Sequence, residues 1–311
     1  MTRLLLAEAP FRTLTSRALV EDAAGGAPVL LATHAGAPAG FTAVPAGDVP
    51  DGVTEAVLVG QFFDRTWFER ALATAAAARE AGARLVVHNL GLDGKAAMSP
   101  PDGRGVLDRA DTIGLRDHRT ANILTLWRVA APLRVLGFPE RRIAPDPTLA
   151  AGLPEGPILG IALRGDATMA EAVRLPPILR RIAARQGWSV LHLPVAMPGV
   201  PDDDAAPSRA ATASVVPDAQ LLLPHLAQPL AWRRQMTPAR LKGLVARCDL
   251  VLTNRDLLAA YAADCGVPVI GLAEGPDRRI VSCMATLANA LAPGSVLLHP
   301  AACRAAPHPV A

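Results

Sequence analysis

The stretch that decides the fold is residues 110–150, which read ADTIGLRDHRTANILTLWRVAAPLRVLGFPERRIAPDPTLA. An apolar run at residues 112–115 is short enough to be a buried parallel strand. Asp117 follows it, and a carboxylate at this place can accept the free backbone N–H groups of the first turn of a helix. We therefore predict a strand that leads directly into a helix, with Asp117 as the N-cap.

The second half of this stretch is predicted to complete the helix and to begin another strand. From Ile123 to Leu136 the apolar residues recur at spacings of three and four, which is typical of one face of a helix. Pro132 interrupts the pattern and is expected to kink the helix or to split it in two, and Gly137 is placed to end it. Residues 143–144 are then predicted to form a minimal strand before an Asp-Pro turn.

The same alternation of strand and helix extends over most of the chain. Further strands are predicted at residues 4–6, 29–31, 56–60 and 85–88, and, after a Gly- and Pro-rich linker at 152–157, at residues 158–163, 189–193, 219–223, 249–253 and 268–272. Such alternation is typical of parallel sheets covered by helices and joined by right-handed crossovers. We predict an α/β fold with two Rossmann-like domains, residues 1–154 and 155–311, whose sheets face each other across a cleft as in the GT-B glycosyltransferases.

Size and charge limit the possible functions. The chain of 311 residues is long enough for two domains, and its net charge is only +3. No basic stripe with interleaved aromatic residues is present, so we do not expect nucleic acid binding. No apolar run reaches the roughly 18 to 20 residues that cross a membrane. Glu8 interrupts the first apolar run, so we expect a soluble, cytoplasmic protein without a signal peptide.

The cysteines do not indicate a metal site. All four lie in the second half of the chain and form no C-x-x-C pair: Cys248, Cys265, Cys283 and Cys303. Cysteines scattered in this way are expected to be small buried hydrophobic residues rather than zinc ligands or disulfide partners. No metal and no resident cofactor is predicted.

Two sets of motifs occur in a characteristic order. The first is Arg116-Asp117 at the predicted helix start, Leu-Gly at 136–137 and Pro-Asp-Pro-Thr at 145–148. The second is Arg255 after an apolar strand, followed by an apolar helix and Gly-Val-Pro-Val-Ile at 266–270. Together they resemble the polysaccharide pyruvyl transferase family, in which an Arg-Asp pair begins a helix that ends in Leu-Gly and an Asp-Pro turn closes the next strand.

The chain departs from that family at three places. The Asn-x-Gly-Asp loop near the N-terminus is absent, and the run of glycines that begins at Gly60 in relatives is replaced by residues with side chains. Leu257 stands where relatives carry the histidine of an Arg-x-His triplet. A leucine cannot donate a proton, so family activity requires another group, Asp256, His225 or His192, in that role.

Strand ends supply a second argument that is independent of the family. Ligands of open parallel sheets bind outside the carboxyl ends of the strands. Guanidinium and imidazole groups beside helix N-termini suit phosphate or carboxylate groups. The residues that we predict to bind an anionic donor are Arg164, His192, Arg255, Arg278 and Arg279. Each alone is better explained as a solvated surface charge or, for His192, as a hydrogen-bonded core histidine, and only the clustering makes a binding site an equal alternative.

The resemblance implies transfer of a pyruvyl group from phosphoenolpyruvate, as co-substrate, to a glycan hydroxyl as a ketal in exopolysaccharide biosynthesis. The predicted catalytic residues are Arg255, Asp256 and His225, with the saccharide acceptor on the N-terminal domain. Arg116, Asp117 and Asp146 form a further motif, for which capping and ion pairing are the alternative.

Two other functions stay open. One is a GT-B glycosyltransferase that uses a nucleotide sugar. The other is an inactive relative that binds a saccharide or a partner protein. The sequence indicates no oligomeric state.

Overall fold

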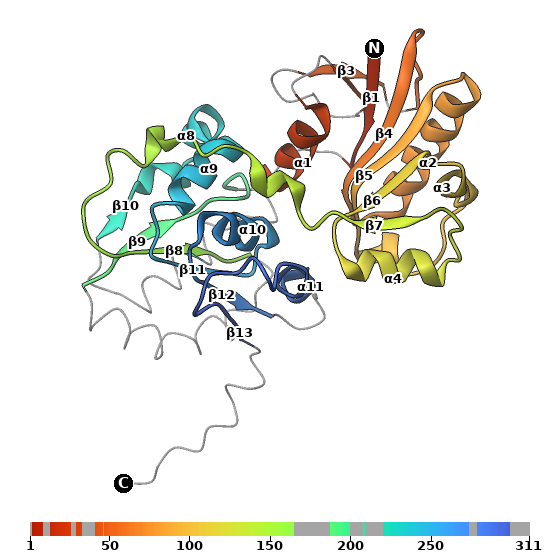
Figure 1. The fold of residues 1–311 in the computed structure, drawn as a ribbon. Coiled ribbons are helices and arrows are strands. Elements are labelled where there is room, and N and C mark those ends of the chain that lie inside the picture. Colours follow the sequence, from red (N-terminus) through yellow and green to blue (C-terminus); the bar gives the residue numbers. More distant parts are fainter. Residues whose placement is uncertain are drawn as a thin grey trace. The chain divides into compact units, whose positions relative to one another are not determined.

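A computed structural model describes residues 2–8, 13–25, 29–32, 41–45, 47–164, 187–199, 208, 220–273 and 279–298. The chain forms two compact units, Met1–Glu140 (unit 1) and Arg141–Ala311 (unit 2). Each unit is built on one sheet, and the paired strands of both sheets run parallel (Figure 1). The predicted α/β fold with two Rossmann-like domains is confirmed.

Unit 1 contains a seven-stranded sheet in the order β3-β2-β1-β4-β5-β6-β7. Its strands are β1 (Thr2–Leu6), β2 (Val29–Ala32), β3 (Thr42–Val44), β4 (Val53–Phe62), β5 (Arg84–Leu92), β6 (Thr112–Leu115) and β7 (Leu133–Val135). Its helices are α1 (Leu14–Ala24), α2 (Arg65–Glu80), α3 (Gly105–Asp108) and α4 (His118–Leu126), with 3-10 turns η1 (Gly94–Ala97) and η2 (Pro139–Arg142).

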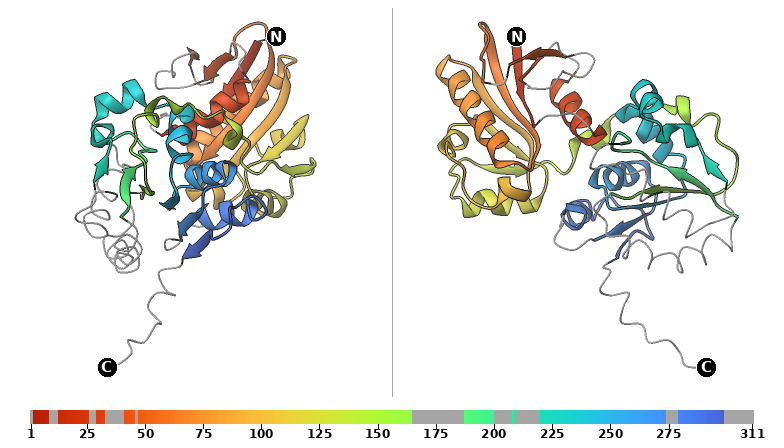
Figure 2. Two further views of the ribbon diagram at one scale, coloured as in Figure 1. Left: turned by 60° about the vertical axis from the view of Figure 1, so that its left-hand side comes forward. Right: turned by 180° about the vertical axis from the view of Figure 1, so that it is seen from behind.

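Alternate residues of the central strands in unit 1 supply two core faces. Leu4 and Leu6 of β1 belong to the cluster that contains Phe68 of α2. Leu5 belongs instead to the cluster that contains Leu19 of α1. Successive side chains of a strand point to opposite faces, so β1 is buried on both sides. Figure 2 shows the result, with α1 on one face of the sheet and α2, α3 and α4 on the other.

Unit 2 contains a six-stranded sheet in the order β10-β9-β8-β11-β12-β13. Its strands are β8 (Ile158–Ala162), β9 (Ser189–His192), β10 (Leu221–Leu222), β11 (Leu250–Thr253), β12 (Val269–Leu272) and β13 (Val296–Leu298). The helices among its described residues are α8 (Pro229–Gln235), α9 (Pro238–Val245), α10 (Asp256–Cys265) and α11 (Arg279–Thr286), with 3-10 turns η3 (Pro147–Leu149) and η4 (Pro224–Ala227). Helix α10 is buried along most of its length because it packs against the sheet and against α9 and α11.

The prediction of a helix that continues to Leu136 is wrong. Helix α4 ends ten residues earlier, Arg128 adopts a left-handed φ of 58°, and the chain then forms β7 beside β6. Pro132 precedes this strand, where its missing N–H removes no bond from the ladder. Apolar residues of both α4 and β7 pack on one core, and this produced the helix-like spacing. Residues 143–144 form no strand.

Residues 141–154 belong to unit 2, so the boundary between the units precedes the predicted division after residue 154. Helix α9 holds this segment. The backbone N–H of Asp146 donates to the carbonyl of Ala239 at 2.9 Å. The buried ammonium of Lys242 donates to two backbone carbonyls of the segment. Gly243 permits the close approach, because a Cβ there would lie 2.7 Å from the Asp146 carbonyl carbon.

Candidate functional site

The carboxyl ends of β8 and β11 form the switch point of the sheet in unit 2. From β8 the chain passes to β9 on one side, whereas β11 lies on the other side of β8. Open parallel sheets bind ligands in the crevice where the strand order reverses in this way. Arg164 comes two residues after β8, and Arg255 two residues after β11. The fold therefore brings two of the predicted anion-binding residues to adjacent strand ends.

Hydrogen bonds join these two strand ends. The Thr253 hydroxyl donates to the carbonyl of Ala162 at 2.9 Å and accepts the backbone N–H of Arg255 at 2.9 Å. Asn254 Oδ1 accepts the backbone N–H of Arg164 at 2.8 Å. Thr253 and Asn254 thus fix the backbone that carries both arginines. Neither residue is among the predicted site residues, although a Thr-Asn pair directly after a buried strand is a signal for side-chain bonding to nearby backbone.

Arg255 and Asp256 lie at the start of α10. Arg255 is the N-cap residue and is 5% exposed, and Asp256 is 8% exposed. The start of a helix presents free N–H groups and a partial positive charge, so a guanidinium here adds to an anion-binding position. Asp256 Oδ1 accepts the backbone N–H of Leu257 at 2.9 Å. Leu257 itself is fully buried and is a core residue of α10.

The two predicted histidines lie farther along the same edge of the sheet. His192 is the last residue of β9, beside β8, and is largely buried. His225 lies in η4 after β10, and its Nε2 is 3.1 Å from Gln235 Oε1. Neighbouring strands are about 4.8 Å apart, so three strand steps separate His225 from Arg255 by roughly 14 Å. His225 is therefore not placed beside Arg255, and its catalytic role stays a prediction.

Arg279 is the first residue of α11, which packs against α10. It follows β12, the strand next to β11. Arg164, Arg255 and Arg279 thus come after three neighbouring strands of the sheet. Arg278 lies outside the residues that the structure describes.

Arg116 and Asp117 support the fold of unit 1. Asp117 is the N-cap of α4, and its Oδ1 accepts the backbone N–H three residues later at 2.8 Å. Arg116 is fully buried, pairs with the Glu140 carboxylate and lies 4.2 Å from the ring centroid of Phe138. Asn89 Nδ2 donates to the second Glu140 oxygen at 2.7 Å. These contacts match the predicted alternative of capping and ion pairing.

Asp146 also has a structural position. It caps η3 by accepting the backbone N–H of Thr148 at 2.9 Å, and Arg240 Nε lies 3.1 Å from its other oxygen. The hydrogen bonds from Thr148, and then those from Arg240, lower the pKa of the Asp146 carboxyl. Asp146 therefore joins residues 141–150 to α9 and stays ionised to a lower pH than an ordinary aspartate.

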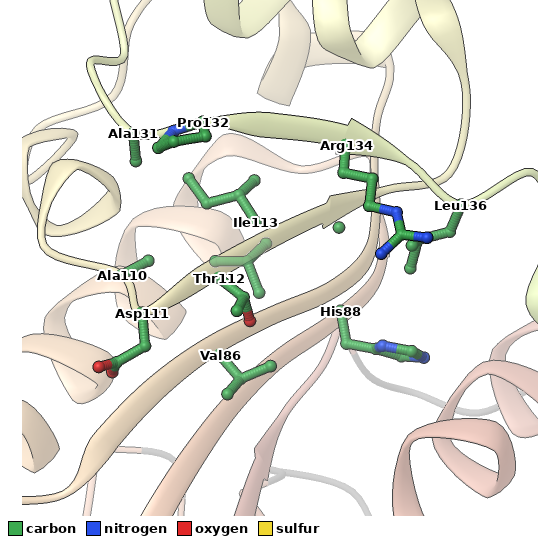
Figure 3. A pocket seen from close by; sticks show the side chains of 12 residues that line it. Val86, His88, Ala110, Asp111, Thr112, Ile113, Ala131, Pro132, Arg134 and Leu136 are labelled. Atoms are coloured by element: carbon green, nitrogen blue, oxygen red, sulfur yellow. The ribbon is translucent and has the colours of Figure 1, made fainter.

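A cavity of about 370 Å³ lies on the sheet of unit 1, over β5, β6 and β7 (Figure 3). His88, Thr112 and Arg134 are among its polar lining residues. His88 Nε2 is 2.7 Å from Asp22 Oδ2 of α1. None of the predicted site residues lines this cavity.

The described residues contain no group of three His, Cys, Asp or Glu side chains that could hold a metal ion. Burial raises the pKa of the Cys248 thiol and keeps it protonated. In the part of the chain that the structure describes, no helix has the length and apolar character needed to cross a membrane.

No protein-family model matches this chain, and no curated protein matches it. Solved structures match its fold. The UDP-GlcNAc 2-epimerase of Methanocaldococcus jannaschii aligns with a TM-score of 0.55 and 12% identity, over 96% of this chain and 89% of the epimerase. The UDP-GlcNAc 2-epimerase of Neisseria meningitidis, bound to UDP-GlcNAc, aligns with a TM-score of 0.52 and 10% identity, over 94% and 87%.

A third similar structure is UGT2 of Phytolacca americana, complexed with UDP-2-fluoro-glucose and pterostilbene. It aligns with a TM-score of 0.50 and 9% identity, over 91% of this chain and 82% of UGT2. Identities this low establish the fold alone. The chain therefore has two Rossmann-like domains and matches the structures of GT-B-like epimerases and glycosyltransferases.

Proposed function

We propose that this chain is a GT-B-type glycosyltransferase that uses a nucleoside-diphosphate sugar, with the diphosphate bound at the switch point of unit 2. The observation that carries the proposal is the junction of Arg164 with Asn254 and Arg255 at the ends of β8 and β11. This junction combines a strand-order reversal with guanidinium groups and the N-terminus of α10. Each of these features favours a phosphorylated ligand.

The similar structures support a nucleotide as the donor. Those from Neisseria meningitidis and Phytolacca americana contain UDP-GlcNAc and UDP-2-fluoro-glucose. In the proposed reaction an acceptor hydroxyl attacks the anomeric carbon, and the bond from that carbon to the diphosphate oxygen breaks. The nucleoside diphosphate leaves with the electron pair. Arg164 and Arg255 would stabilise the negative charge that develops on it.

Pyruvyl transfer from phosphoenolpyruvate is the second candidate. It is favoured by Arg255, which matches the family arginine, and by Gly266, the glycine of the Gly-x-Pro-x-Ile resemblance, which ends α10 in a left-handed conformation ahead of β12. Leu257 disfavours it, because this reaction must protonate the enol carbon and a buried leucine supplies no proton. The two candidates require different donors, a nucleoside-diphosphate sugar or phosphoenolpyruvate. One experiment that compares the binding of both donors therefore separates the candidates.

The experiment measures the Tm of the full chain with 1 mM UDP, UDP-GlcNAc or phosphoenolpyruvate. A ligand at 100 times its Kd adds about 2.7 kcal/mol of stability, which corresponds to a rise of roughly 5 to 10 °C for a unit of this size. We expect UDP and UDP-GlcNAc to raise the Tm. A rise with phosphoenolpyruvate alone would favour pyruvyl transfer, and no rise with any of the three would contradict both candidates.

Variants locate the binding site. Arg255→Ala and the less buried Arg164→Ala are each expected to remove most of the UDP-dependent rise. Arg234→Ala is the matched control, because Arg234 is exposed on α8. Donor binding without release of UDP or phosphate, across a panel of saccharide acceptors, would favour the inactive relative.

A further inference from the structure

The carboxyl ends of β1 and β4 form the switch point of the sheet in unit 1. From β1 the chain passes through α1 and then forms β2, whereas from β4 it passes through α2 to β5 on the other side. A crevice is expected where these connections part. Glu8 comes two residues after β1 and lies at this point, beside Gly60 and Gln61 of β4.

A small polar recess marks this switch point. Glu8, Ser16, Gly60 and Gln61 contribute to its lining. Its volume of about 10 Å³ is close to that of one water molecule or one hydroxyl group. Gly60 has a φ of 104°, which residues with side chains rarely adopt. The recess is therefore suited to a single oxygen atom rather than to a whole sugar ring.

The Glu8 carboxylate is held at the start of α2. Its Oε2 accepts the backbone N–H of Phe63 at 2.6 Å, and the backbone N–H of Asp64 is a second donor. Burial raises the pKa of Glu8 from 4.5 to about 7, although both N–H groups lower it, and the nearby Asp64 carboxylate adds to the rise. A general base is most effective when its pKa lies near the working pH.

Among the residues that the structure describes, few other charges bear on the Glu8 carboxyl. On α1 the side chains of Arg17 and Glu21 pair with each other, with Arg17 Nε 2.6 Å from the glutamate oxygen. Asp22 of the same helix pairs with His88. At the start of α2, Asp64 is the charged group that acts on Glu8, and its side chain is also used to cap that helix. The pKa of the Glu8 carboxyl is therefore set mainly by burial and by the backbone N–H groups of Phe63 and Asp64.

We propose that Glu8 is the general base of unit 1, and that it removes the proton from an acceptor hydroxyl placed in this recess. The inference rests on the proposed function only in requiring a hydroxyl acceptor. In glycosyl transfer the hydroxyl oxygen bonds to the anomeric carbon, the nucleoside diphosphate departs with the electron pair of the broken C–O bond, and the hydroxyl proton passes to the Glu8 carboxylate. Pyruvyl transfer requires the same removal of a hydroxyl proton.

A structural role for Glu8 is the competing explanation, because its bond to Phe63 joins the end of β1 to the start of α2. The two roles differ in what pH does to the reaction. A general base must be ionised, so the rate should rise with pH up to about 7, the pKa of Glu8, and then level off. A structural tie changes stability but produces no such limb in the rate profile.

The first test is independent of any activity. Glutamate labelled with ¹³C at the side-chain carboxyl is introduced into the full chain, and the Glu8 signal is identified by its absence in Glu8→Gln. We expect this signal to titrate near pH 7. It should also shift on addition of a mixture of methyl β-D-glucoside, methyl β-D-galactoside and N-acetylglucosamine. A titration below about pH 5, or no shift with any of the three sugars, would overturn the inference.

The second test measures release of UDP from UDP-GlcNAc in the presence of these sugars. Glu8→Gln is expected to lower kcat by roughly 10²- to 10⁴-fold and to remove the limb near pH 7, while UDP still raises the Tm. Glu80→Gln, at an exposed position of α2, is the matched control. A Glu8→Gln rate within threefold of the wild type would overturn the inference. Failure of UDP to bind would contradict the proposed donor alone, and the carboxyl titration would still decide the role of Glu8.

Discussion

The buried ion pair of unit 1 offers the sharpest test of how this fold is stabilised. Arg116 and Glu140 are both fully buried. Glu140→Gln keeps an oxygen that can accept from Asn89 but removes the carboxylate that pairs with the buried guanidinium. Removing one partner of a buried pair typically costs about 3 to 5 kcal/mol, because the remaining charge stays desolvated. We expect unit 1 to lose that much stability.

Calorimetry and hydrogen exchange measure this loss. For a unit of this size, the expected cost lowers the Tm of unit 1 by roughly 10 to 15 °C. Hydrogen exchange should show the loss of protection in β5, which carries Asn89, and in β6, which Arg116 directly follows. The exposed Glu80→Gln variant should change the Tm by less than about 2 °C.

A double variant separates the charge effect from packing. Arg116→Met with Glu140→Gln removes both charges, while the methionine can still pack on Phe138. Replacing a whole buried pair by uncharged residues is often close to neutral, so most of the lost stability should return. A Glu140→Gln variant that melts within about 2 °C of the wild type, or a double variant no more stable than Glu140→Gln, would refute this account of the pair.

Three further predictions concern stability. Glu8 has a raised pKa in the folded state, so its contribution to the free energy of unfolding is greatest below pH 4.5 and is lost as pH rises to about 7. Between pH 4.5 and 8, the free energy of unfolding measured in urea should fall by about 1 to 3 kcal/mol more for the wild type than for Glu8→Gln. Lys242→Met leaves two carbonyls and a carboxylate without their donor, and should cost about 2 to 4 kcal/mol at the urea midpoint of unit 2. Gly243→Ala places a Cβ against the backbone of Asp146 and should cost more than about 2 kcal/mol in the same assay, whereas Gly152→Ala, in open space, should be close to neutral.

Local patterns in the sequence predicted most of the strands because each is a short apolar run between polar turns. The N-cap role of Asp117 was also predictable from a local pattern, because its capping bond spans only three residues. The pattern failed after Leu126, where α4 and β7 pack on one core and share a single apolar spacing. Periodicity reports which residues are buried, and it cannot separate two short elements that cover the same core.

The candidate site was only partly predictable, for a different reason. The strand-end rule selected Arg164 and Arg255, which the sheet order brings together. His225, which was predicted to be catalytic with Arg255, is placed three strands away from it by the same order. Glu8 was missed because Phe63, which holds it, lies 55 residues away in the chain. Which strands are neighbours is a tertiary property, and no local motif in this sequence encodes it.

The scarcity of lysine gives the folded chain a built-in chemical reporter. Only Lys95 and Lys242 are present, the first exposed in unit 1 and the second buried in unit 2. An amine-reactive reagent should therefore acylate Lys95 rapidly in the native protein and reach Lys242 only when unit 2 opens. Mass spectrometry of the two peptides would then give, from a single reaction series, the opening rate of unit 2 measured against an internal standard.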